Sequence, residues 1–232
     1  DTMPTLILQH SSYGAAGNVA AVLIEHGIRT ETIRLDNGES LPPDLNGIDG
    51  IISCGGPASA TDDSLPWLAG EMAMLKAAHN LSIPILGICL GSQVLARALG
   101  GTVQKMPQGP SVGLVQVNLN PIGREDPLFR GQPWYGEWPS WHEDEVSELP
   151  PGAKLMASSE FCKVEAWQIG VFSYGVQFHP EWSSKELIAI TEDTSRLPAG
   201  TDADTAAIRA EAHDRAESID RCADALLHEC GG

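Results

Sequence analysis

The sequence predicts an α/β fold: a mostly parallel central sheet with helices on both faces, and antiparallel hairpins added in the second half of the chain. Over residues 5–100, short apolar runs alternate with segments of helical periodicity, which is the pattern of βαβ units. After residue 102, strand-like runs follow one another with few helices between them, as in antiparallel sheets. A chain of 232 residues is also long enough to bury a sizeable core without disulfides.

The first half is predicted to hold four strands and three helices. Each strand is a short apolar or β-branched run bounded by turn residues, and each helix carries apolar residues at three- and four-residue spacing. The first and third helices are expected to stop at Gly27 and Gly100, since glycine commonly ends a helix. In chain order we expect strand 5–10, helix 17–27, strands 30–35 and 48–57, helix 65–81, strand 83–91 and helix 92–100.

The second half is predicted to be richer in strands and to end in helices. Ser183 and Glu186 form a capping-box pattern, so a helix is expected over 183–193. After a loop, a last helix at 205–229 carries one apolar face, formed by Ile208, Ala212, Ile219, Ala223 and Leu226, which predicts packing rather than partner binding. The predicted strands are 102–106, 113–120, 154–158, 163–170 and 171–180. We expect residues 1–192 to form one domain, followed at 193–232 by a C-terminal loop and packing helix.

The composition excludes several kinds of partner. The formal net charge is −17, and so acidic a surface repels phosphate backbones and anionic lipids, so we expect neither nucleic-acid nor membrane binding. The five cysteines include no C-x-x-C pair, which indicates neither a disulfide framework nor a zinc site, and no other metal or cofactor is expected. The N-terminus does not resemble a signal peptide, and the cytoplasm is the expected compartment.

The segment "GICLG" at 87–91 has the form Gly-x-Cys-x-Gly, between a predicted buried strand and a predicted helix. This is the cysteine version of the nucleophile elbow, a turn too sharp for bulky neighbours. It would place Cys89 at a helix N-terminus, where the helix dipole favours the reactive thiolate. A buried structural cysteine is the alternative. Gly56, in the "CGGP" turn of the neighbouring strand, and Leu90 are the expected backbone donors to a developing oxyanion.

The segment "YGVQFHPEW" at 174–182 ends a buried strand with His179 and Glu181, two residues apart. We expect Pro180 to hold this segment extended, so that both side chains lie on one face. Glu181 can then bind one ring nitrogen of His179 and leave the other facing a thiol, which is the logic of a catalytic triad. The alternative is an inert surface turn.

These motifs resemble those of the class I glutamine amidotransferase family. The match comprises "GICLG" at Cys89, "YGVQFHPE" at His179 and Glu181, and "GGP" at 55–57, in order and spacing, within a likeness that runs over 5–190. The segment "WHEDEVSELPPGAKLMASSE" is most similar to the glutaminase domain of GMP synthase and its stand-alone relatives. The resemblance implies a flavodoxin-like fold and hydrolysis of a γ-glutamyl amide through a thioester on Cys89.

The same resemblance implies a substrate pocket. Gln93 stands four residues after the nucleophile, where family members contact the glutamyl part of the substrate, and Trp141 and His142 match the segment that lines the pocket. His142 is expected to be a wall of that pocket rather than a second base. The chain departs from its relatives at Glu143, where they often have glycine, and at Trp182, where a smaller residue is more usual.

Several functions are compatible with these residues. The favoured one is stand-alone hydrolysis of glutamine or a related small γ-glutamyl compound. The first alternative is a glutaminase subunit that delivers ammonia to a separate synthetase partner. A non-catalytic regulatory domain ranks below both because the triad is intact. An α/β-hydrolase ranks lower too, because its acid usually precedes the histidine by many residues, whereas Glu181 follows His179.

Overall fold

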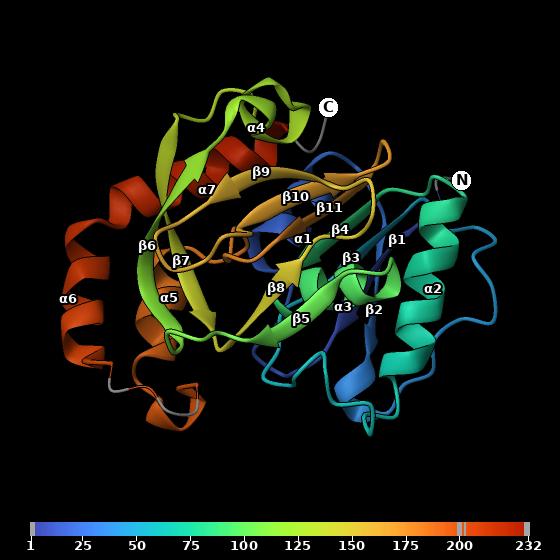
Figure 1. Cartoon of the computed structure of the whole chain (residues 1–232), viewed down its shortest axis with the longest axis horizontal. Coiled ribbons are helices and arrows are strands. Elements are labelled where there is room, and N and C mark those ends of the chain that lie inside the picture. Colours follow the sequence, from blue (N-terminus) through green and yellow to red (C-terminus); the bar gives the residue numbers. More distant parts are fainter. Residues whose placement is uncertain (1–2, 199–200, 202, 230–232) are drawn as a thin grey trace.

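A nine-stranded sheet runs through the computed structural model of the chain, and helices cover both of its faces (Figure 1). The structure describes residues 3–198, 201 and 203–229. Five neighbouring strands are parallel: β2 (Thr30–Arg34), β1 (Thr5–Gln9), β3 (Gly50–Ser53), β4 (Ile85–Ile88) and β11 (Ser173–Val176). The sheet continues antiparallel through β10 (Ala166–Ile169), β9 (Lys154–Ser158), β6 (Ser111–Leu119) and β7 (Tyr135–His142). The predicted architecture is therefore confirmed.

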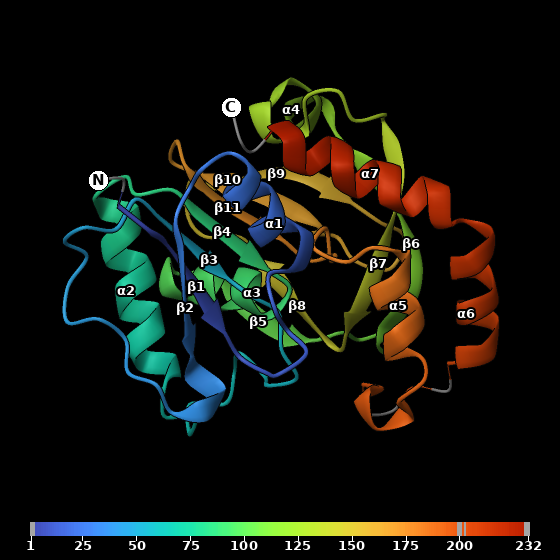
Figure 2. The same ribbon diagram turned by 180° about the vertical axis from the view of Figure 1, so that it is seen from behind.

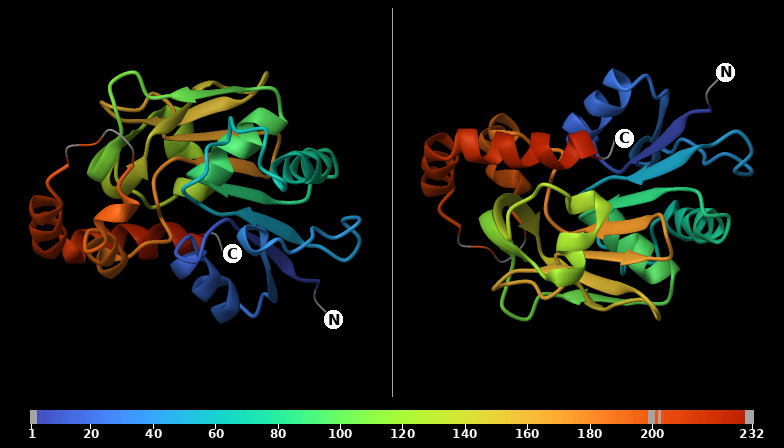
Figure 3. Two further views of the ribbon diagram at one scale, coloured as in Figure 1. Left: turned by 90° about the horizontal axis from the view of Figure 1, so that it is seen from below. Right: turned by 90° about the horizontal axis from the view of Figure 1, so that it is seen from above.

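The helices form a layer on each side of this sheet. On one face lie α2 (Leu68–Asn80) and α3 (Leu90–Ala98), together with a small sheet of β5 (Thr102–Lys105) and β8 (Asp144–Glu148). The opposite face carries α1 (Gly17–Glu25) and α7 (Ala216–Glu229), as Figure 2 shows from behind. The short helices α4 (Pro121–Glu125) and α5 (Ser184–Ile190) and the helix α6 (Thr205–Asp214) complete the fold, and the views along the sheet separate the layers (Figure 3).

The core is divided between the two faces of the sheet. Successive side chains of a strand point to opposite faces, so Ile51 packs in the cluster under α2 and α3 while Ile52 packs in the cluster under α1 and α7. Burial on both faces explains why the strands of the first half are continuous apolar runs. Leu226 of α7 belongs to the second cluster, so the C-terminal helix shares a core with the parallel strands.

The predicted single helix at 205–229 is wrong in one respect, because the structure divides it at Arg215 into α6 and α7. The two halves pack on partly different neighbours: both contact α5, but α6 also contacts β6, whereas α7 contacts α1 and β7. A straight helix could not follow both surfaces, so the chain turns between them (Figure 2). Of the five residues predicted on the apolar face, Ala212, Ile219, Ala223 and Leu226 are buried and Ile208 is half-buried. Helix α5 begins at the predicted capping box of Ser183 and Glu186.

Two strands, β7 and β8, and the helix α4 were not predicted. Strand β7 carries Pro139, which favours the reading of a loop, but β7 is an edge strand that pairs only with β6, and proline is tolerated there. Several predicted strands are also shorter than expected, and the strand predicted at 171–180 ends at Val176. No helix in the described part of the chain is long and apolar enough to cross a membrane.

Candidate active site

Cys89 occupies a sharp turn between β4 and α3. Its backbone has φ 50° and ψ −106°, which a residue with a side chain rarely adopts, and its N–H donates to the Val176 carbonyl over 2.8 Å. The turn requires glycine at position 91, because a Cβ atom there would lie 1.9 Å from the carbonyl oxygen of Ser53 on β3. The strained cysteine and the close backbone contact are the features that the Gly-x-Cys-x-Gly pattern predicts.

His179 and Glu181 form a buried pair just beyond the end of β11. The Nδ1–H of His179 donates to Oε1 of Glu181 over 2.7 Å, and the side chains are only 5% and 2% exposed. The predicted extended conformation is wrong, because Trp182 donates its N–H to the His179 carbonyl over 3.4 Å and closes a turn. Pro180 holds the second position of that turn, where its fixed φ is favoured. The turn brings the two side chains together as the prediction required.

Cys89 and His179 meet because β4 and β11 are neighbours in parallel register, with Ile88 opposite Val176. Both residues pack against Gly55: a Cβ atom there would lie 3.0 Å from Cε1 of His179 and 3.6 Å from Cβ of Cys89. Nε2 of His179 is buried and has no hydrogen-bond partner among the described residues. The ring nitrogen not held by Glu181 is therefore uncommitted.

The surroundings of His179 favour its protonated form. Burial disfavours the imidazolium, but the negative charges of Glu181 and of an ionised Cys89 outweigh it and raise the pKa of His179 to about 10. His142 behaves in the opposite way, because burial lowers its pKa to about 4. His142 is therefore neutral at physiological pH. Its Nδ1–H donates to the carbonyl of Asp144, the first residue of β8, over 2.9 Å.

The predicted site residues line one cavity of about 280 Å³. They are Gly56, Cys89, Leu90, Gln93, Trp141, His142, His179 and Glu181. A Cβ atom at Gly56 would lie 3.2 Å from Cδ2 of Leu90, so the two residues expected to supply the oxyanion donors are neighbours in space. The carbonyl oxygen of Trp141 lies 4.0 Å from Sγ of Cys89. Nε2 of Gln93 donates to the Asp144 carbonyl and to Gln177, which fixes the amide at the cavity wall.

A buried network of hydrogen bonds holds the Gly-Gly turn in place. Nε2 of His10 lies 2.8 Å from Oε2 of Glu71, and the other carboxylate oxygen accepts from the Ser53 hydroxyl over 2.6 Å. Nδ1–H of His10 donates to the carbonyl of Cys54, which also accepts the N–H of Gly91. His10 and Glu71 thus tie the turn to the elbow. The sequence did not reveal this network, because Glu71 stands on an amphipathic helix where acidic residues usually face water.

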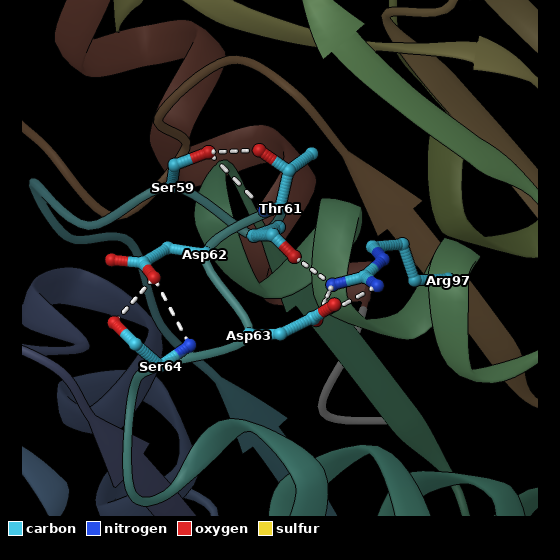
Figure 4. A network of polar contacts seen from close by, with 7 residues as sticks. Ser59, Thr61, Asp62, Asp63, Ser64 and Arg97 are labelled. Carbon is cyan, nitrogen blue, oxygen red and sulfur yellow. Dashed lines mark hydrogen bonds and ion pairs between the residues drawn. The ribbon is translucent and has the colours of Figure 1, made fainter.

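The loop that follows the Gly-Gly turn is also fixed at several points (Figure 4). Arg97 of α3 contacts the Ala60 carbonyl and lies 3.1 Å from Asp63, and the Ser59 hydroxyl bonds Thr61. The same hydroxyl donates to Oδ2 of Asp144 over 2.6 Å. The cavity wall formed by Pro57 and Ala58 is therefore held to both α3 and β8.

The parts of the cavity wall that were not predicted from the sequence include Tyr13, Trp182 and the wall segment 195–198. The imidazole of His179 stacks on Trp182, with ring centroids 3.9 Å apart. The indole N–H of Trp141 donates to the Arg196 carbonyl over 2.8 Å and holds the wall segment in place. No sequence motif marks this segment, and only the unusual Trp182 gave a signal.

Comparisons with known proteins find relatives over most of the chain. The family model described as glutamine amidotransferase class-I matches residues 11–193. The chain is 31% identical over 189 residues to γ-glutamyl peptidase 3 of Arabidopsis thaliana, covering 78% of this chain and 74% of that protein. It is 42% identical over 139 residues to a glutamine-hydrolyzing GMP synthase subunit of Thermococcus kodakarensis, covering 59% of this chain and 68% of that protein. The crystal structure of a glutamine amidotransferase from Methylobacillus flagellatus superposes with a TM-score of 0.86, 28% identity and 99% and 94% coverage.

Proposed function

Since the chain belongs to the class-I glutamine amidotransferase family, we propose that it hydrolyses the γ-glutamyl amide of glutamine or of a related γ-glutamyl compound through a thioester on Cys89. The observation that carries the proposal is the buried His179–Glu181 pair, with its 2.7 Å contact, beside that cysteine. Because Glu181 holds one ring nitrogen, the other can exchange a proton with the thiol and with the leaving group.

In the first half of the reaction, the Cys89 thiolate attacks the γ-carbonyl carbon and a C–S bond forms. The electron pair of the C=O bond moves to oxygen, for which the N–H groups of Gly56 and Leu90 are the proposed donors. Loss of one such donor typically costs about 3 kcal/mol of barrier. When the intermediate collapses, the C–N bond breaks and His179 gives its Nε2 proton to the departing nitrogen, which leaves as ammonia or an amine.

In the second half, water attacks the thioester carbonyl and His179 takes a proton from that water. The C–S bond then breaks, glutamate leaves, and the thiolate and imidazolium are restored. We assign Gln93, Trp141 and His142 to the pocket for the glutamyl part, because all three line the cavity that contains Cys89.

Two biological roles fit this chemistry. We favour a stand-alone hydrolase, because the γ-glutamyl peptidase relative aligns with 78% of the chain. The second role is a glutaminase subunit that delivers ammonia to a separate synthetase, which the 42% identity to the GMP synthase relative supports. A thiolate nucleophile works in a reducing compartment, so the cytoplasm is the proposed location.

The test is to incubate the purified chain with glutamine and a panel of γ-glutamyl amides and peptides, with Cys89→Ala in parallel, and to follow glutamate release. Release that disappears in the variant supports the thioester route, and the preferred substrate identifies the role. Equal release by both proteins contradicts it. Activity that appears only after a co-purified synthetase is added favours the subunit role.

A further inference from the structure

The wall segment 195–198 carries a cationic group at the cavity. Among the described residues that line the cavity, Arg196 is the only lysine or arginine, whereas Glu143, Asp144 and Glu181 are acidic. The chain as a whole has a formal net charge of −17. An anionic group that enters this cavity therefore meets one permanent positive charge, in addition to the imidazolium of His179.

The guanidinium of Arg196 is fixed on two sides. Its Nε donates to Oδ2 of Asp193 over 2.9 Å, and its central carbon lies 4.4 Å from the centroid of the Tyr13 ring. Stacking of a guanidinium on an aromatic face reduces the conformational freedom of the long side chain. The side chain is 34% exposed, so ligands can still reach it.

The two terminal nitrogens of Arg196 have no hydrogen-bond partner among the described residues, because Asp193 uses only Nε. A guanidinium can bind a carboxylate with two parallel N–H···O bonds, and its end-on pair of nitrogens is suited to this geometry. The backbone of Arg196 is itself held by the indole of Trp141, whose carbonyl oxygen lies 4.0 Å from Sγ of Cys89. The backbone that carries these two terminal nitrogens is therefore held by Trp141, which also contacts the nucleophile Cys89.

We propose that Arg196 binds a carboxylate of the γ-glutamyl substrate and selects for substrates that carry one there. The inference deepens the proposed function, on which it rests. Two carboxylates have the required chemistry: the α-carboxylate of the glutamyl part, and the carboxylate of an amino-acid leaving group. The family model ends at residue 193, so this contact lies outside the part of the chain that the family model matches.

Four substrates separate these sources. Glutamine and γ-glutamylethylamide carry only the α-carboxylate, γ-glutamylglycine adds a leaving-group carboxylate, and the α-amide of glutamine carries neither. Arg196→Gln should lower kcat/KM by about 10- to 100-fold, mainly through KM, for the substrates that carry the bound carboxylate. A loss for all but the α-amide identifies the α-carboxylate, and a loss for γ-glutamylglycine alone identifies the leaving group. Arg196→Lys keeps the charge and should recover part of the activity.

The proposal is wrong if Arg196→Gln leaves kcat/KM unchanged for every substrate, or lowers it equally for all four. Arg130→Gln, which removes an exposed arginine that does not line the cavity, is the matched control. If the wild type and Arg196→Gln hydrolyse these compounds equally well, this inference is wrong but the proposed function still stands. Calorimetric binding of γ-glutamylglycine and of glutamine α-amide to the Cys89→Ala protein, with and without Arg196→Gln, makes the same comparison when turnover is absent.

Discussion

The imidazole of His179 lies flat against the indole of Trp182, with centroids 3.9 Å apart and planes inclined by only 10°. The hydrogen bond to Glu181 fixes one edge of the ring, and the stacked indole fixes its plane. An aromatic face also stabilises a neighbouring cation, so the stack favours the imidazolium.

Replacing Trp182 should therefore reduce catalysis. Contacts between stacked rings are worth about 0.5–1.5 kcal/mol, so Trp182→Leu should lower kcat about 2- to 10-fold and move the alkaline limb of the pH profile to lower pH. Steady-state kinetics across pH measure both effects. Trp182→Phe retains an aromatic face and should remain close to wild type; equal losses in the two variants would count against a role for stacking.

The pH dependence of the wild-type chain should reflect the protonation of His179. Its pKa is raised to about 10, so the imidazolium that protonates the leaving group is present at neutral pH and activity should fall as the pH rises through about 10. Glu181→Gln removes the principal charge that raises this pKa, so the fall should begin at lower pH. The profile of kcat/KM against pH for both proteins tests this, and identical alkaline limbs would contradict it.

The same raised pKa has a consequence for stability. Protonation stabilises the folded state fully below the ordinary histidine pKa of 6.5, and this contribution is lost as the pH rises towards about 10. The difference in unfolding free energy between the wild type and Glu181→Gln should accordingly be larger at pH 6 than at pH 10. Urea unfolding at the two pH values measures this difference. A difference that grows with pH would contradict a raised pKa of His179 in the folded state.

Glu71 should matter for both stability and rate. Leaving a buried polar group without its hydrogen-bond partner typically costs about 1–3 kcal/mol, and Glu71→Ala would leave both Nε2 of His10 and the Ser53 hydroxyl unpaired. Glu71→Gln can still bond to Ser53 and should cost less. Because His10 joins the Gly-Gly turn to the elbow, the fraction of each variant that folds should have a lower kcat and a nearly unchanged KM. Chemical denaturation and kinetics together test this, and an unchanged kcat in folded protein would limit the network to a structural role.

Gly55 should tolerate no side chain without a loss of rate. A Cβ atom there would be 3.0 Å from the His179 ring, tighter than ordinary contact, so Gly55→Ala should displace the ring from Cys89 and lower kcat at least about 10-fold. Gly70→Ala, in α2, where a Cβ atom would meet only the side chain of Leu41, is the matched control for adding a methyl group. Equal kcat values for the two variants would contradict the crowding argument.

The local sequence predicted the elements whose signals are themselves local. The elbow at Cys89 depends on glycines within two residues, and the pair of His179 and Glu181 depends on a proline between them, so short motifs identified both. The parallel strands are buried on both faces, so they can be recognised in the sequence as continuous apolar runs.

What could not be predicted depends on contacts between distant segments. The strand β7 was not predicted, because Pro139 fits a strand only at the edge of a sheet and the sequence does not say which strand lies at an edge. No local pattern marks Glu71 as buried, since its partners His10 and Ser53 come from other elements. Arg196 is held at the cavity by contacts with Trp141, Tyr13 and Asp193, and no periodicity in the sequence records such contacts. The break at Arg215 likewise follows from the surfaces that α6 and α7 cover.

The adjacency of β4 and β11 has a consequence for how the active site forms during synthesis and folding of the chain. The strand that delivers Cys89 is made early in translation, whereas its parallel neighbour, which delivers His179, emerges only after β5 to β10 have been made. Pairing strands so far apart in sequence closes a long loop and is intrinsically slow. A nascent chain that ends before residue 176 carries the thiol without its base. In refolding experiments, recovered activity should therefore report the docking of β11 and lag behind the return of helical signal.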